Sequence, residues 1–136
     1  MSESSSHMRL VRSLSQWVAK RYFDGDTGHI LVDSPHNTAS AKPPSVCGFV
    51  PDVYAGPTRE GGFIIGEAKT ARDIENRHTR AQLLAFLKRC GEDERTVLIM
   101  AVPWEMERFT KALLEILKCR ASAQKVSTVV LEKLPG

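Results

Sequence analysis

The chain has few of the features that mark membrane, secreted or disulfide-stabilised proteins. Its three cysteines, Cys47, Cys90 and Cys119, are odd in number and lack a CxxC spacing, which argues against a disulfide framework and a zinc knuckle. We expect reduced thiols packed as small hydrophobic side chains. No apolar run approaches the ~20 residues that a membrane-spanning helix requires. The serine-rich start, Met1–Met8, lacks the apolar stretch of a secretory signal, so we expect a soluble, cytoplasmic protein with no membrane partner.

The excess of positive over negative charge is also small. Nineteen Lys and Arg residues oppose 16 Asp and Glu residues, a formal net charge of +3. This mild excess permits a nucleic-acid partner without indicating one. The 136 residues are 42% hydrophobic, enough for one domain with a real core. Because no internal repeat or interior linker divides the chain, we expect a flexible polar tail over residues 1–8 and a single domain over 9–136.

Hydrophobic spacing predicts an α/β fold. Apolar residues recur three and four apart in the helical segments, and short apolar or β-branched runs bounded by turn residues mark the strands. Glycine and proline between 56 and 62 predict an antiparallel hairpin, and the proline-containing segment 34–48 a long loop. The predicted order is helix 9–23, strands 29–33, 49–55 and 62–69, helix 79–89, strand 96–102, helix 104–119 and strand 126–131. Such an order predicts a mixed sheet with helices on both faces and strand 96–102 in its centre.

Aromatic residues are few, and only two are tryptophans. Trp17 and Trp104 both stand at helical spacing with other apolar residues. That pattern favours a place in the core over a role as platforms for base stacking.

The most informative segment runs from Val50 to Lys69 and reads VPDVYA, a glycine-rich turn, and GFIIGEAK. Side chains alternate between the two faces of a strand, so Glu67 and Lys69 point to one side and Ala68 to the other. The apolar Phe-Ile-Ile run before them places these charges at the mouth of a core. A hairpin could bring Asp52 beside Glu67.

Two converging carboxylates cannot both stay ionised cheaply unless a cation lies between them. Oxygen ligands without Cys or paired His select a hard ion, so Asp52 and Glu67 are candidate ligands for Mg²⁺ or Mn²⁺. Lys69 would add a positive charge next to that metal, where it could orient an attacking water, help to deprotonate it, or stabilise developing negative charge. The set is suited to hydrolysis of a phosphodiester.

These residues resemble the PD-(D/E)XK nuclease superfamily. Pro51-Asp52, followed fifteen residues later by Glu67-Ala68-Lys69, is similar to its motif, and the predicted order of elements is similar to its αβββαβ, restriction-endonuclease-like core over residues 9–102. The resemblance implies metal ligands at Asp52 and Glu67 and a catalytic lysine at Lys69. Within the superfamily the chain resembles the small RecB-like or Holliday-resolvase-like nuclease domains. Gln82 and Phe86 resemble the Gln-x-x-x-Tyr element of the RecB-like branch, with Phe in place of Tyr. The resemblance gives Gln82 a role in orienting the metal-site water or contacting a phosphate.

Two further features bear on this resemblance. Many members carry an extra acid on the first helix, whereas residues 9–23 contain no Asp or Glu, so we expect one metal ion rather than two. The residues that follow Lys69 include candidates for contacts to nucleic acid, namely Arg72, Arg77, His78 and Arg80. His78 is equally suited to a capping or turn position before the predicted helix.

Simpler interpretations remain open. Asp52 could be an ordinary edge-strand residue, and Glu67 and Lys69 could form a surface ion pair worth ~0–1 kcal/mol. The leading hypothesis is a metal-dependent nuclease acting on DNA, possible as a homodimer that addresses two strands. The alternatives are a catalytically inactive member of the same fold that binds nucleic acid or protein, and a structural or regulatory α/β domain. The sequence leaves open DNA against RNA and the form of the substrate.

Overall fold

The computed structural model describes residues 5–34 and 42–132, which form an α/β domain. Strands and helices alternate after an initial meander, as the apolar spacing predicted. The elements are α1 (Ser5–Tyr22), β1 (Ile30–Val32), β2 (Val53–Ala55), β3 (Ile64–Ala68), α2 (Ala71–Ile74), α3 (Arg77–Gly91), β4 (Val97–Ala101), the 3₁₀ helix η2 (Trp104–Met106), α4 (Glu107–Arg120) and β5 (Ser127–Leu131). Residues 35–41, the first half of the expected long loop, lie outside the described residues.

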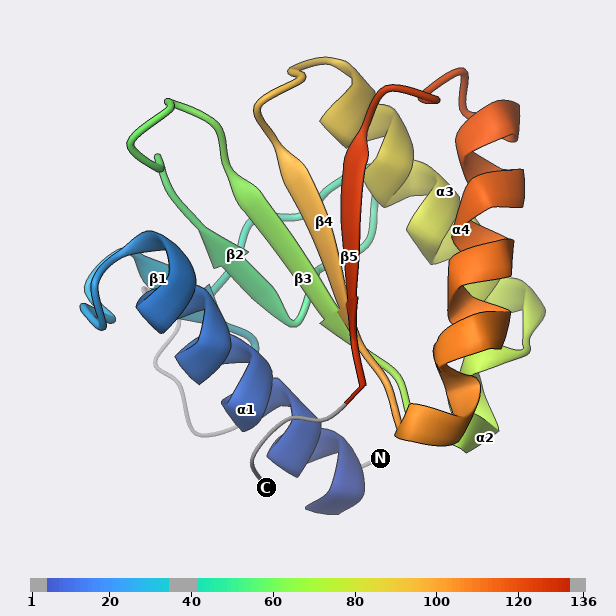
Figure 1. The fold of residues 1–136 in the computed structure, drawn as a ribbon, viewed down its shortest axis with the longest axis horizontal. Helices are drawn as coiled ribbons and strands as arrows, with labels where there is room; N and C mark the ends of the chain where they lie inside the picture. The colour runs from blue at the N-terminus through green and yellow to red at the C-terminus, as the bar shows by residue number, and fades with distance from the viewer. Residues whose placement is uncertain (1–4, 35–41, 133–136) are drawn as a thin grey trace.

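The five strands form one open mixed sheet in the order β1-β2-β3-β4-β5. The first three are antiparallel neighbours, and β3, β4 and β5 run parallel to one another. Figure 1 shows α1 against one face of the sheet and α3 and α4 against the other. The expected mixed sheet with helices on both faces is therefore confirmed. The expected hairpin is confirmed too, with Val53 opposite Gly66.

Two expectations about the elements need correction. The middle strand is β3, not the segment 96–102, because β1 and β2 add two strands on its other side; β4 lies second from the edge. The first helix begins at Ser5 rather than at residue 9, so residues 5–8 belong to the helix and not to a polar tail. The second correction brings one more side chain to the site described below.

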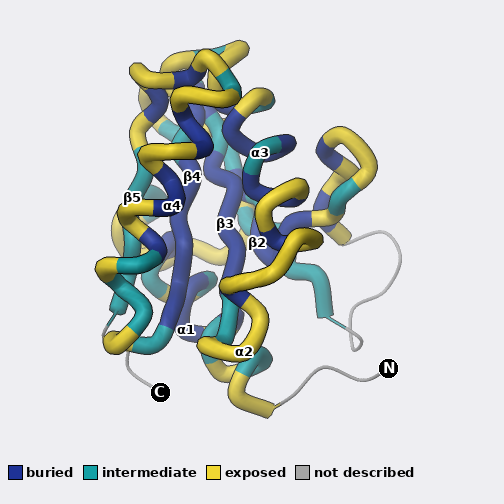
Figure 2. Tube along the Cα trace, turned by 90° about the vertical axis from the view of Figure 1, so that its right-hand side faces the viewer, coloured by how far each residue is buried: buried dark blue, intermediate teal, exposed yellow. Residues whose placement is uncertain are grey.

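The sheet separates two apolar cores, and side chains along β3 alternate between them. Ile65 lies in the core under α3 and α4 with Phe86, whereas Ile64 and Ala68 lie in the core under α1 with Leu14. All five residues of β3 are buried, and Figure 2 shows β3 and β4 dark along their length. A strand covered on both faces reads as a continuous apolar run. A charged residue within such a strand is therefore an exception that requires a partner.

Gly66 allows α1 to approach β3 closely. A Cβ atom at this position would lie 3.1 Å from Leu14 Cδ2 and 3.1 Å from Val53 Cβ, tighter than ordinary van der Waals contact. Both neighbours are fully buried and have little room to move. The absence of a side chain here fixes the distance between α1 and the sheet.

We expect Gly66→Ala to lower the free energy of unfolding by about 1–3 kcal/mol, because overpacking a filled core forces side chains and backbone apart. Gly91→Ala is the matched control. Its added Cβ would meet Ala123 at 3.5 Å, an ordinary contact, inside a helix where Ala is preferred to Gly. Urea unfolding of the two variants checks this, and equal midpoints would show that α1 is not tightly seated on Gly66.

The cysteines and tryptophans are only partly where the sequence placed them. All three cysteines are free thiols, but only Cys90 is packed in the core; Cys47 and Cys119 are exposed. Burial raises the pKa of the Cys90 thiol to about 12, which keeps it protonated and unreactive. Trp17 packs against the core under α1, as expected, whereas Trp104 is 70% exposed. None of the helices in residues 5–34 and 42–132 is both long and apolar enough to cross a bilayer.

Candidate active site

The hairpin places Asp52 and Glu67 opposite each other at one end of the sheet. Asp52 immediately precedes β2 and Glu67 lies in β3, and the register that pairs Val53 with Gly66 brings them together. The backbone N–H of Asp52 donates to Glu67 Oε1 at 3.0 Å, and the N–H of Ala68 donates to Asp52 Oδ2 at 2.9 Å. Each carboxylate thus accepts a hydrogen bond from a backbone N–H of the neighbouring segment.

Both carboxylates are buried, with 5% of Asp52 and 2% of Glu67 exposed. Glu67 shares the α3–α4 face of β3 with Ile65, as strand alternation predicted. An acid this deep in a core is costly unless it is compensated. The simpler interpretation, a solvated strand end with a surface ion pair, does not fit this burial.

Lys69 supplies part of the compensation. Its Nζ lies 3.2 Å from Glu67 Oε2, and its side chain is only 12% exposed. Its backbone N–H donates to Ala101 O at 3.0 Å, which fixes the residue at the carboxyl ends of β3 and β4. The side chain of Lys69 is therefore fixed beside Glu67 and is not an exposed surface lysine.

Burial and the neighbouring Asp52 carboxylate raise the pKa of Glu67 to about 8, although Lys69 and the Asp52 N–H act in the opposite direction. The 3.2 Å contact with Lys69 would suggest an ionised Glu67, but one lysine does not offset desolvation plus a second acid. Without a further cation, Glu67 therefore carries a proton near neutral pH. A bound cation would take the place of this proton and allow both carboxylates to stay ionised.

This proton makes stability depend on pH. Unfolded Glu67 has its ordinary pKa of 4.5, so between about pH 4.5 and pH 8 the folded protein holds one more proton than the unfolded chain. The stabilisation is complete below the unfolded pKa and is lost as pH rises through the folded one. We expect the melting temperature of the metal-free protein to fall by several degrees between about pH 5 and pH 8.5.

Glu67→Gln should flatten this fall, because the side chain no longer titrates while its amide oxygen can still accept from the Asp52 N–H. Asp93 and Glu107, whose pKa values are lowered, titrate below this range and cannot imitate the effect. Thermal unfolding in chelator across the pH range measures it. An unchanged slope in Glu67→Gln would assign the proton to another group.

His7 is a site residue that the sequence did not reveal. Its Nε2 lies 3.2 Å from Asp52 Oδ2 and 3.1 Å from Ala68 O. Both partners are acceptors, so Nε2 carries the proton. The available signal was spacing: positions 7, 11, 14 and 18 form one helical stripe with the buried Val11, Leu14 and Val18. Because the predicted helix began at residue 9, His7 was left outside this stripe.

Gln82 lies on the helix that covers the same face of the sheet as Glu67. It is 6% exposed, and its Oε1 has no hydrogen-bond partner among the described residues. A buried amide oxygen without a partner costs about 1–3 kcal/mol, which marks it as available to a ligand or water. Phe86, one turn later, is fully buried in the core and provides no polar group.

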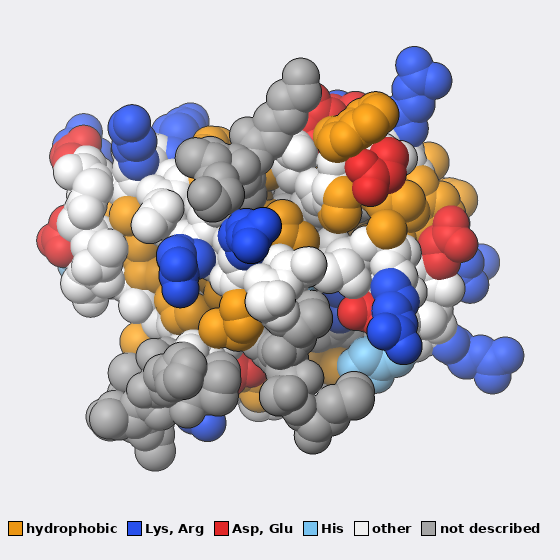
Figure 3. All heavy atoms as spheres, turned by 90° about the horizontal axis from the view of Figure 1, so that it is seen from below, with side chains coloured by type: hydrophobic (Ala, Val, Ile, Leu, Met, Phe, Trp, Pro, Cys, Tyr) orange, Lys and Arg blue, Asp and Glu red, His pale blue; other side chains and the backbone are white. Residues whose placement is uncertain are grey.

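The basic residues after Lys69 are exposed but are not drawn into the carboxylate pair. Arg72 lies on α2, and Arg77 and Arg80 lie in the first turn of α3. His78 packs edge-on against Phe49, with 5.5 Å between ring centres, while Asn76 caps the helix by accepting from Thr79 N–H at 2.7 Å. Figure 3, viewed onto this end of the molecule, shows Lys and Arg spread among hydrophobic and uncharged atoms rather than gathered in one patch.

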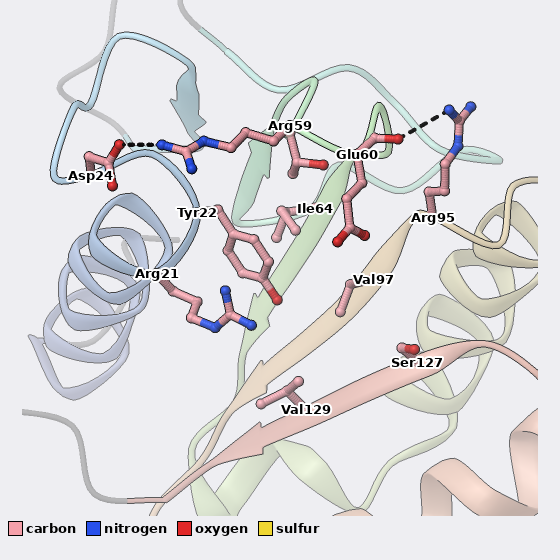
Figure 4. A pocket seen from close by; sticks show the side chains of 11 residues that line it. Arg21, Tyr22, Asp24, Arg59, Glu60, Ile64, Arg95, Val97, Ser127 and Val129 are labelled. Carbon is pink, nitrogen blue, oxygen red and sulfur yellow. Dashed lines mark hydrogen bonds and ion pairs between the residues drawn. The ribbon is translucent and has the colours of Figure 1, made fainter.

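A separate cavity of about 370 Å³ lies at the opposite end of the sheet, beside the amino ends of β3, β4 and β5 (Figure 4). Two of its arginines already have partners: Arg59 binds Asp24 at 2.8 Å and Arg95 binds the Glu60 carbonyl at 3.2 Å. None of the predicted site residues lines it. The buried, mutually bonded acids make the other end of the sheet the better candidate for chemistry.

The donors at the carboxylate pair suit Mg²⁺ or Mn²⁺. No three His, Cys, Asp or Glu side chains within residues 5–34 and 42–132 form a ready metal-binding cluster. Mg²⁺, however, is commonly held by one or two carboxylates, with water and substrate phosphate completing its shell. Asp52 and Glu67 match that requirement, because their carboxylates lie side by side at one end of the sheet.

Comparison of the chain with protein-family models, with curated proteins and with solved structures found no match in any of the three.

Proposed function

We propose that the protein is a metal-dependent nuclease with a restriction-endonuclease-like αβββαβ core, acting on DNA. The observation that supports this most strongly is the buried Asp52–Glu67 pair with Lys69 bonded to it at 3.2 Å. Apart from the short helix α2 between β3 and α3, the order α1, β1, β2, β3, α3, β4 agrees with this core and supports the fold assignment. The exposed arginines of α2 and α3 supply charge for a phosphate backbone nearby.

Asp52 and Glu67 would hold the metal ion, Mg²⁺ or Mn²⁺. When bound, the ion supplies Lewis-acid polarisation of a phosphoryl oxygen and lowers the pKa of a water ligand. His7 Nε2 lies 3.2 Å from Asp52 Oδ2 and 3.1 Å from Ala68 O, so the imidazole occupies space beside the Asp52 carboxylate. Cation binding would therefore require the imidazole to turn aside or to lose its Nε2 proton.

The other residues act around this pair. Lys69 Nζ, held 3.2 Å from Glu67 Oε2, would lie beside the ion and could orient a water or stabilise charge on the phosphate oxygens. Gln82 Oε1, buried without a partner, can accept a hydrogen bond from that water and orient it. Burial of both carboxylates keeps bulk water away, which strengthens these electrostatic interactions.

A cleavage panel tests the proposal. Wild type and Asp52→Asn are incubated with linear duplex, single-stranded, branched and RNA substrates, with Mg²⁺, with Mn²⁺ or with chelator. Asn at position 52 can still accept from the Ala68 N–H, so the fold should persist while the charge is lost. We expect metal-dependent cleavage by wild type only. Metal-dependent binding without cleavage would instead support an inactive member of the same fold. If the protein neither binds nor cleaves any of these substrates, a role with nucleic acid is refuted.

A further inference from the structure

Two exposed large hydrophobic residues, Val50 and Trp104, belong to chain segments at the end of the sheet that carries the carboxylate pair. The described residues include three such side chains: Val50 at 41%, Trp104 at 70% and Ile116 at 54% exposed. Val50 stands two positions before Asp52, and Trp104 three positions after the last residue of β4. An indole left in water at the rim of a polar site marks a contact surface more than a packing residue.

Trp104 is held at the same end of the sheet as Lys69. Lys69 N–H donates to Ala101 O at 3.0 Å, and three residues of chain span at most about 11 Å. Figure 1 shows η2, which Trp104 begins, and α2, which follows Lys69, at the same end of the molecule. The backbone around the indole is fixed, because Met106 N–H donates to Pro103 O at 2.9 Å and Glu107 N–H donates to Trp104 O.

The charges nearby identify what such a ring would meet. The arginines of α2 and α3 suit phosphates. Trp104 is followed instead by Glu105 and by Glu107, whose carboxylate forms an ion pair with Lys111 Nζ at 3.2 Å. The arginines can bind phosphates, whereas the flat apolar face of the indole suits the face of a base. In a duplex those faces are covered by stacking, so only an unpaired base offers one.

We infer that Trp104 stacks on an unpaired base of the strand held at Asp52 and Glu67. This rests on the proposed function and narrows its substrate to nucleic acid that is single-stranded beside the bond to be cut. Long duplexes without a frayed or branched region are then poor substrates. Trp104 is a binding residue that sets substrate form.

The two tryptophans make a direct test possible. Trp17→Phe leaves Trp104 as the single tryptophan, since Trp17 packs in the core under α1 and Phe preserves most of its apolar contact. Its fluorescence is followed during titration with oligo(dT) and with a blunt hairpin duplex, with Ca²⁺ in place of Mg²⁺. We expect emission to be quenched by oligo(dT) and unaffected by the duplex.

Matched variants separate stacking from general adhesion. Trp104→Ala should weaken oligo(dT) binding by about tenfold or more, the usual effect of losing one stacked base, and leave duplex binding unchanged. Trp104→Phe should recover most of the loss. Ile116→Ala, which removes an exposed hydrophobic side chain ten residues into α4, should change neither.

Several results would overturn the inference. These are unquenched Trp104 at saturating oligo(dT), equal losses for both ligands in Trp104→Ala, and emission that shifts with protein concentration alone, which would assign the ring to a second copy of the chain. The cleavage panel judges the proposed function separately. Cleavage without quenching would reject only the role of Trp104, and quenching without cleavage would reject only the nuclease.

Discussion

Lys69→Met is expected to reduce the rate of metal-dependent cleavage by about a thousandfold while leaving the protein folded. A charge held next to the reacting phosphate contributes several kcal/mol to the transition state, and each ~1.4 kcal/mol corresponds to a factor of ten. Met preserves the volume and apolar contacts of the mostly buried lysine stem. The measurement is a single-turnover rate with Mg²⁺, and circular dichroism checks the fold.

Two companions sharpen this prediction. Lys69→Arg keeps the charge but places a planar, bulkier group that does not give up its proton beside Glu67, so activity should not return. Lys88→Met removes an exposed lysine near the end of α3 and should leave the rate unchanged, which separates a local role from diffuse positive charge. Near-normal cleavage by Lys69→Arg would reduce Lys69 to general electrostatic attraction.

The hairpin that carries the site could be predicted because two independent signals agreed. Glycine and proline between residues 56 and 62 fixed the turn, and alternation in GFIIGEAK fixed which side chains share a face. Register then follows from turn and pattern together, which is why Asp52 meets Glu67 through a hydrogen bond of 3.0 Å. Local chemistry was sufficient for this part of the molecule.

The positions of His7 and Trp104 could not be predicted from local sequence patterns. His7 falls in a serine-rich stretch with weak helix propensity, yet α1 begins at Ser5 and His7 contacts Asp52 and the Ala68 carbonyl on the sheet. Trp104 has helical spacing relative to the apolar residues of α4, but the chain forms the separate 3₁₀ turn η2 before that helix begins at Glu107. The phase of the apolar stripe therefore breaks, and the indole faces solvent.

The position of strand 96–102 was mistaken for a similar reason. A continuous apolar run indicates burial on both faces, which is true of β4, but it does not distinguish the middle strand from its neighbour. β3 is buried throughout although it contains Gly and Glu, because a close approach by Leu14 covers one and the hydrogen bond from Asp52 compensates the other. Strand order depends on these tertiary contacts.

Mn²⁺ is expected to raise the melting temperature of wild type by several degrees and that of Asp52→Asn or Glu67→Gln by far less. Binding to the folded state alone contributes about 2.7 kcal/mol at a hundredfold excess over Kd, enough for such a shift in a domain of this size. The carboxylate variants lose the charge of one ligand and therefore much of the affinity for the ion. Differential scanning calorimetry with and without Mn²⁺ measures the difference.

The same experiment at two pH values, repeated with Lys69→Ala, distinguishes the metal ligands from the neighbouring lysine. The Glu67 carboxyl, with its pKa near 8, must lose its proton to bind, so the Mn²⁺-induced shift in wild type should grow from about pH 6.5 to pH 8.5. At the higher pH, Lys69→Ala should retain the shift, because the lysine is a neighbour of the ion and not a ligand, even though its cleavage is lost. Equal shifts in wild type and both carboxylate variants would place the ion elsewhere, and the nuclease assignment of this pair would fall with the metal site.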